Sequence, residues 1–329
     1  MAENREWLDI SAAEYHALDA ISSGGLRMYE KVSPLEYYVT YVSRTKKSPG
    51  TTATKLGTAF HAAMEDPSAW EDAYRVISDT LDDEAICDVV NVSLDASGSG
   101  SKRANVGDTL NRRLPAHKMY EENLAADAAA QGQELITHDQ LEIIRRQVDA
   151  VYDSPACRDY VGRKTSSNVE MACVYNTDLS KPAKALCDLV LPECIVDFKT
   201  TKALNPHQFL RDALDNHGYQ YQAAHYLYVT GFTEFRFITV TSEAVMRSGS
   251  PCEANVWFVP DYELERAKVK NLQTMRTICD HFSHDDEYPP QLDSQGVPFH
   301  WHNEGYGAMD PLPMDRAAFA NDPSEEVWR

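Results

Sequence analysis

The chain has 329 residues and carries 51 Asp and Glu against 31 Lys and Arg, which gives a formal net charge of −20 at pH 7. Hydrophobic residues make up 43% and charged residues 25%. These fractions are ordinary for a globular protein and exclude a disordered chain, a collagen-like fibre and a small disulfide-rich scaffold. Taken alone, the negative charge argues against nucleic-acid binding, because contacts to phosphates require Lys and Arg.

The first half of the chain is predicted to be mainly helical. Ser22 and Ser23 can cap a short helix around 26–30. Apolar residues spaced four apart predict a helix over 55–65, and an amphipathic pattern predicts another over 138–152. Between these helices the run SGSGS at 97–101 has the composition of a flexible loop.

The second half alternates between predicted strands and helices. Strands are expected at 168–175, 183–191, 194–199, 235–241 and 255–259, and helices at 206–214, 219–230 and 262–282. This pattern predicts an α/β or α+β architecture, in which helices flank a central mixed sheet. We expect one domain over 1–288, with a helical N-terminal part at 1–160 and a catalytic core at about 165–260, and a Pro- and Gly-rich acidic tail over 289–329.

Charge is unevenly distributed along the chain. Segment 66–95 has nine acids and one base, and segment 280–329 has eleven acids and two bases. By contrast, 22–55 has six bases against two acids, and 97–120 has five bases against one acid. The sequence therefore predicts a basic channel lined by the last two segments, with the acidic surfaces facing away from it.

The sequence predicts neither a membrane span nor a signal peptide. No window approaches about 18 uninterrupted apolar residues, and the start MAENREWLDI lacks an apolar run. The seven cysteines are scattered without a C-x-x-C motif. They are expected to be free thiols in a reducing cytoplasm rather than ligands of an iron–sulfur cluster.

Three acids and one lysine fall on consecutive predicted strands: Glu170, Asp188, and Asp197 with Lys199. Strand alternation sends Asp197 and Lys199 to the same face, and the turn at Pro192 brings Asp188 back toward Asp197. Two carboxylates on neighbouring strand ends suit Mg²⁺ or Mn²⁺. A nearby lysine can orient or deprotonate a water, or stabilise a pentavalent phosphorane, so the set predicts metal-assisted phosphodiester hydrolysis. A buried structural salt bridge to Lys199 is the alternative interpretation.

Two further motifs flank this set. Upstream, Gly57 and His61 form G-x-x-x-H on a predicted helix, and His61 can face the metal site, although a lone helical His is more often structural. Downstream, Gln222 and Tyr226 lie four residues apart on one helix face and can both approach the site or DNA. For Tyr226 taken by itself, core packing is the simpler explanation.

In this order, the motifs resemble the PD-(D/E)XK nuclease superfamily, and most closely its branch with RecB-type nuclease domains. Within that branch, DFKTT followed by GYQYQAAHYL resembles RecE-type exonuclease VIII and its phage and prophage relatives. The likeness spans about residues 21–282. One departure is Cys187, which stands where the superfamily name has a proline.

The resemblance implies a restriction-endonuclease-like fold and an Mg²⁺-dependent exonuclease, for which Mn²⁺ is a possible substitute. Its substrate would be linear double-stranded DNA, degraded 5′→3′ to leave a 3′ single-stranded tail for recombination. The relatives form ring-shaped homo-oligomers and work with a single-strand annealing protein, in the cytoplasm of a bacterial or phage-infected host cell. We expect double-stranded DNA ends, an annealing protein and further copies of the chain as partners, and no membrane.

The resemblance also implies roles for individual residues. The expected metal ligands are His61, Glu170, Asp188, Asp197 and the carbonyl of Phe198. Lys199 is expected to position the attacking water. Gln222 and Tyr226 are expected to support the site and contact the DNA strand.

A 5′-end exonuclease also needs a cation for the terminal phosphate of DNA. The candidates are Arg27, Lys102, Arg103, Arg112 and Arg113.

Other functions stay open from the sequence. One is a nuclease of the same superfamily that acts on single-stranded DNA or in CRISPR adaptation, although the absent cysteine cluster argues against the latter. Another is a catalytically inactive DNA-end-binding module that recruits a recombination partner, and intact acids with Lys199 argue against such decay. The last is an unrelated metal-binding enzyme.

Overall fold

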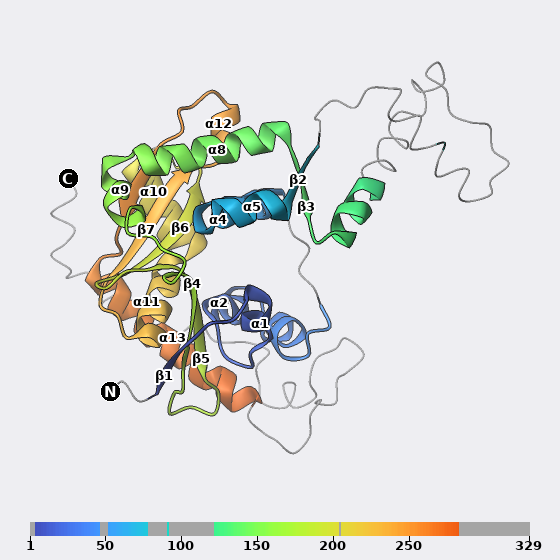
Figure 1. Ribbon diagram of the computed structural model, residues 1–329. Coiled ribbons are helices and arrows are strands. Elements are labelled where there is room, and N and C mark those ends of the chain that lie inside the picture. Colours follow the sequence, from blue (N-terminus) through green and yellow to red (C-terminus); the bar gives the residue numbers. More distant parts are fainter. Residues whose placement is uncertain (1–3, 47–51, 78–90, 92–121, 204, 283–329) are drawn as a thin grey trace.

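A six-stranded mixed sheet organises the computed structural model, which describes residues 4–46, 52–77, 91, 122–203 and 205–282 (Figure 1). The strand order is β1-β4-β5-β6-β7-β8, with β6 and β7 parallel and the other neighbours antiparallel. The strands are β1 (Arg5–Leu8), β4 (Val169–Tyr175), β5 (Ala183–Val190), β6 (Ile195–Thr201), β7 (Phe235–Thr241) and β8 (Ala254–Trp257). A separate parallel pair joins β2 (Tyr74–Ile77) to β3 (Glu134–Thr137).

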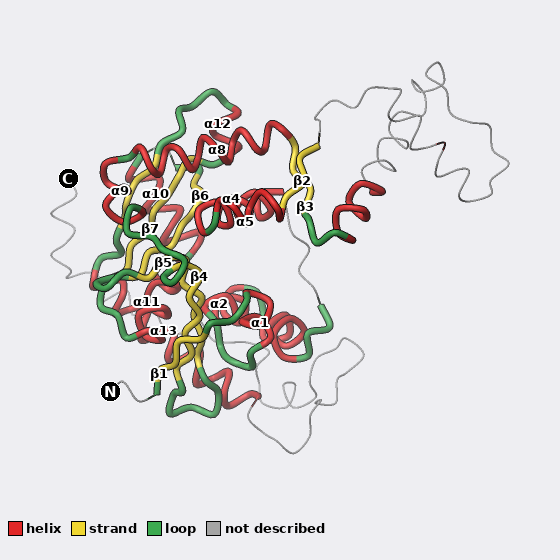
Figure 2. The backbone as a smooth tube through the Cα atoms, viewed as in Figure 1, coloured by secondary structure: helices red, strands yellow, loops and turns green. Residues whose placement is uncertain are grey.

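Helices cover both faces of the large sheet (Figure 2). One face packs against α11 (Tyr219–Thr230), which is backed by α13 (Asp261–Phe282) and α2 (Ser23–Lys31). The other face packs against α4 (Thr52–Glu65), α8 (His138–Asp153) and α9 (Pro155–Val161). Further helices are α1 (Ala12–Ala17), α3 (Pro34–Tyr37), η1 (Tyr38–Val42), α5 (Pro67–Ala73), α10 (Pro206–Leu210), η3 (Arg211–His217) and α12 (Glu243–Arg247), and residues 122–130 are also helical.

The predicted α/β architecture is confirmed as a mixed sheet flanked by helices. The predicted bounds of α11 and β7 match the structure, and Gly231 closes α11 with a φ of 79°. Sequence reasoning missed β1, β2 and β3, which lie in the half of the chain that it predicted as mainly helical, although it found β8, which is equally short. Strands of four residues carry little pattern of their own and depend on their pairing partners. The segment predicted as one helix over 206–214 is α10 followed by the wider turns of η3.

The sheet opens between β5 and β6, and this opening positions the site. The two strands pair at Leu189↔Val196 and Val190↔Ile195, after which β5 continues on β4 and β6 continues on β7. In place of the next ladder bond, the backbone N–H of Phe198 donates to the Asp188 carboxylate at 2.7 Å. A side chain therefore occupies the point where the two strands separate.

The structure bears on two expectations from the sequence: that no helix spans a membrane and that the cysteines are free thiols. Within the described ranges, no helix combines the length and apolar character needed to cross a membrane. The six cysteines among the described residues are all free, and five of them are buried. Cys87, the loop at 97–101 and the tail at 289–329 lie outside the described residues.

Candidate active site

Asp197 and Lys199 lie together at the centre of the sheet, as strand alternation predicted. Asp197 is 1% exposed, forms an ion pair with Lys199 and accepts a hydrogen bond from Gln222 Nε2 at 2.7 Å. Burial raises the pKa of Asp197 to about 6, against the opposing effect of the Lys199 ammonium. Burial by itself would lower the pKa of Lys199, but Asp197 and Asp188 outweigh it and raise that pKa. Lys199 is thus held as an ammonium.

Asp188 links this pair to α4. Its Oδ2 atom accepts the Phe198 N–H and lies 3.3 Å from His61 Nδ1. Burial would raise the pKa of Asp188, but the charge and hydrogen bond of His61 lower it overall. In turn, Asp188 raises the pKa of His61 against the effect of burial. The predicted approach of the helical His61 to the acids is therefore what the structure shows.

Glu65 also belongs to this cluster, and sequence reasoning missed it. It lies one turn after His61 on α4, and one potential ligand atom from each of His61, Glu65 and Asp188 lies within 4.8 Å of the others. Burial, together with the charges of Glu170 and Asp188, raises the pKa of Glu65 to about 7. The available signal was the i, i+4 spacing of His61 and Glu65, which puts both on one helix face.

Glu170 faces the same cluster from β4. The pairs Val169↔Leu189 and Met171↔Cys187 flank it, so it stands opposite Asp188. Its φ of 48° is in the left-handed region, a strained conformation for a residue with a Cβ. Burial, followed by the charge of Asp188, raises the pKa of Glu170. A strained backbone and a raised carboxyl pKa at the same residue both cost stability. Their combination is typical of a functional site.

The donor set fits a divalent cation. Carboxylate oxygens are the preferred ligands of Mg²⁺ and Mn²⁺, and an imidazole nitrogen also suits Mn²⁺. Asp188, Glu65, Glu170 and Asp197 gather around His61 with three of the four carboxyl pKa values raised. Burial first, and then repulsion between the acids, disfavours their charged forms, and a bound cation would relieve both effects. The Phe198 carbonyl is also at the site, where it accepts a hydrogen bond from Lys199 Nζ at 3.3 Å.

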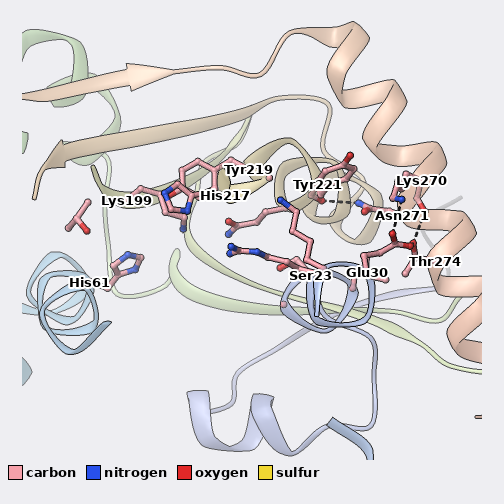
Figure 3. Close-up of a pocket in the computed structure, with 18 residues that line it drawn as sticks. Ser23, Glu30, His61, Lys199, His217, Tyr219, Tyr221, Lys270, Asn271 and Thr274 are labelled. Atoms are coloured by element: carbon pink, nitrogen blue, oxygen red, sulfur yellow. Dashed lines mark hydrogen bonds and ion pairs between the residues drawn. The ribbon is translucent and has the colours of Figure 1, made fainter. Parts of the chain in front are cut away.

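A cavity of about 720 Å³ opens beside these residues, and its lining comes from α2, α4, β6, α11 and α13 (Figure 3). His61 and Lys199 lie at one end and Lys270 on α13 at the other. Arg27 and Lys31 of α2 add positive charge, and Lys270 is paired with Glu30 at 2.7 Å. The basic segment 22–55 thus contributes to the cavity, as predicted.

The other residues singled out in the sequence divide into three groups. Arg27 and Gln222 line the cavity. Tyr226 is 8% exposed and packs edge-on against Phe235 in the core, with ring centroids 5.8 Å apart. Burial, followed by the charge of Asp197, raises the pKa of Tyr226, so this side chain packs in the core close to the acids, and its contact with DNA stays a prediction. The predicted bases Lys102, Arg103, Arg112 and Arg113 lie outside the described residues, as does most of the two acidic segments.

Comparisons with known proteins find no family for the chain and only weak structural similarities. No family model matches the chain, and neither does any curated protein. Among solved structures, a protein from Eubacterium rectale named as a candidate exonuclease aligns at 12% identity over 87% of this chain and 97% of its own, with a TM-score of 0.49. The protein SSO0001 aligns at 10% identity over 68% of this chain and 86% of its own, with a TM-score of 0.23. These likenesses are too weak to carry an argument, so function has to be inferred from the site.

Proposed function

We propose that the protein is a metal-dependent nuclease that hydrolyses phosphodiester bonds of DNA. The observation that carries the proposal is the buried contact of Lys199 with Asp197 at the point where β5 and β6 separate, beside a cavity with basic residues. A structural salt bridge explains the pair alone. It does not explain why Glu65, Glu170 and Asp188 gather around the same point with His61.

The residues divide the chemistry between them. Asp188, Asp197, Glu65, Glu170 and His61 would hold the cation, which when bound polarises the phosphate and lowers the pKa of a bound water. Lys199 acts as an ammonium, because its raised pKa keeps it charged, and so it orients the attacking water and stabilises charge developing on the phosphate. Gln222 holds Asp197 in place by donating to its Oδ1 atom.

The sequence resemblance extends the proposal to a PD-(D/E)XK exonuclease of RecE type. The substrate is then linear double-stranded DNA, degraded 5′→3′ with Mg²⁺, or Mn²⁺ in its place. The cavity supports a polynucleotide substrate, because Arg27 and Lys31 line it together with His61 and Lys199 and can contact phosphates. Ring-shaped self-association and a single-strand annealing partner belong to the same proposal.

A single set of digestions tests this function. Linear duplex labelled at its 5′ or 3′ ends and closed circular duplex are incubated with the protein in Mg²⁺ or in EDTA. We expect metal-dependent loss of linear DNA, early release of the 5′ label and retention of the 3′ label, with Asp197→Ala and Lys199→Ala inactive. Phe258→Ala is the control variant, because Phe258 is 69% exposed and does not line the cavity.

Other outcomes separate the alternatives. Cutting of closed circles would overturn the exonuclease proposal while leaving a nuclease. Early release of the 3′ label would reverse the polarity. Tight binding of ends without hydrolysis in any metal would favour the DNA-end-binding module.

A further inference from the structure

A second cavity lies on the same face of the sheet, next to Lys199. Its volume is about 380 Å³, at the lower end of the ~300–1,000 Å³ range of small-molecule pockets. Thr201, Thr239 and Asn255 of three adjacent strands form part of its floor, and Phe209 and Trp257 line it as well. We call this the strand-end cavity. It shares no lining residue with the larger cavity beside His61 and Lys199.

The lining suits a flat, uncharged group with polar edges. Phe209 and Trp257 stack with ring centroids 4.5 Å apart and an interplanar angle of 24°. Trp257 Nε1 donates to Thr239 Oγ1 at 2.8 Å, which fixes the indole. The amide of Asn255 and the hydroxyl of Thr201 provide donors and acceptors, whereas the buried hydroxyl of Thr239 holds the indole. Among the described lining residues there is one acid, Glu253, and no Lys or Arg, so a phosphate is disfavoured here.

Strand register gives the position of this cavity relative to the catalytic lysine. Lys199 pairs with Thr239, and Thr239 pairs with Asn255, so the three form one row across β6, β7 and β8. Neighbouring strands lie about 4.8 Å apart, which places Asn255 roughly 10 Å from Lys199 and Thr239 halfway between them. In a nucleotide, the sugar and the base together extend a comparable distance from the phosphate. A phosphate held at Lys199 can therefore direct the base of the same nucleotide toward this row.

We propose that the strand-end cavity binds the nucleobase of the nucleotide that adjoins the scissile phosphate. This proposal rests on the proposed nuclease function. Aromatic side chains bind bases through their faces with little sequence preference, and amide and hydroxyl groups meet the base edges. A base held here cannot stay paired with its complement, so the terminal base pair has to open before cleavage.

The test compares DNA ends with and without a terminal base. Linear duplexes carry either a normal terminal nucleotide or an abasic tetrahydrofuran residue, and kcat/KM is measured for wild type, Trp257→Ala and Asn255→Ala. We expect removal of the base to reduce wild-type kcat/KM about tenfold, in line with base–aromatic stacking. Both variants should cleave the two substrates at similar rates. The control Phe258→Ala changes the next residue to Trp257, outside the cavity, and should discriminate like wild type.

Equilibrium binding separates failure of this proposal from failure of the nuclease function. dAMP and deoxyribose 5-phosphate are titrated into each variant by calorimetry, a measurement that needs no turnover. We expect wild type to prefer dAMP about tenfold and Asn255→Ala, changed at an exposed position, to lose most of that preference. Active protein that cleaves abasic and normal ends equally, or variants that keep the preference for a base, would overturn the cavity assignment. Absence of hydrolysis on every DNA overturns the nuclease function, and the titration then decides whether the cavity binds a base.

Discussion

Replacing Glu65 with Gln tests whether the acidic cluster is built to hold a cation. Glu65 is partly buried beside Glu170 and Asp188, and its pKa is raised from 4.5 to about 7. The folded chain therefore holds this proton more tightly than the unfolded chain does. Without metal, ionisation of Glu65 therefore destabilises the folded chain. This loss of stability is nearly absent below about pH 4.5, grows as the pH rises, and is complete above about pH 7.

The magnitude follows from the shift. One pKa unit corresponds to about 1.4 kcal/mol, so ionised Glu65 lowers the free energy of unfolding by about 3 kcal/mol near pH 8 and by about 1 kcal/mol near pH 5. Gln has the shape of the protonated acid and carries no charge. Glu65→Gln should therefore stabilise the metal-free protein by about 3 kcal/mol near pH 8 and by much less near pH 5.

The assay is urea unfolding at both pH values, in EDTA and in Mn²⁺. In EDTA we expect the stability gain to grow with pH. In Mn²⁺ we expect the wild type to gain stability by mass action and the variant to gain less, because it has lost a ligand. Glu142→Gln on exposed α8 surface is a matched control and should change neither result. A variant that is less stable than wild type near pH 8 in EDTA, or that keeps the full Mn²⁺ effect, would refute the reasoning.

Three further predictions concern the neighbouring groups. Lys199→Met should reduce kcat by about 10²–10³-fold with little change in KM for DNA, measured by single-turnover digestion, whereas a purely structural lysine would leave the rate of the folded variant unchanged. Gln222→Ala should lower the free energy of unfolding by about 1–3 kcal/mol, since Asp197 Oδ1 loses its donor, and an unchanged urea midpoint would contradict that role. Arg27→Ala should reduce the preference for 5′-phosphorylated over 5′-hydroxyl ends about tenfold in a competition digest, and an unchanged preference would remove Arg27 from the phosphate site.

The sequence was informative where chemistry follows from local spacing. Alternation along β6 predicted that Asp197 and Lys199 share a face, and the helical position of Gln222 predicted its approach to the site. Tyr226, one turn after Gln222, shares that helix face. It lies near enough to the site for the charges of Asp197 and Asp188 to add to burial in raising its pKa, and it packs against Phe235 in the core.

The features that could not be predicted from the sequence depend on contacts between residues far apart in the chain. The separation of β5 from β6 depends on competing pairings with β4 and β7, and no local pattern encodes it. The strand-end cavity depends on the register that aligns Lys199, Thr239 and Asn255, which belong to three separate strands. Glu65 could have been found from its spacing to His61, but only tertiary packing makes its charge unusual.

The location of a bound cation tests the central claim most directly. Crystals grown with Mn²⁺ and measured for anomalous scattering reveal the metal without reliance on activity. The account predicts an anomalous peak among His61, Glu65 and Asp188, adjoining Asp197 and the Phe198 carbonyl, that is absent in Asp188→Asn crystals. Wild-type crystals saturated with Mn²⁺ that show no peak there, or a peak only elsewhere, would contradict the metal-dependent nuclease.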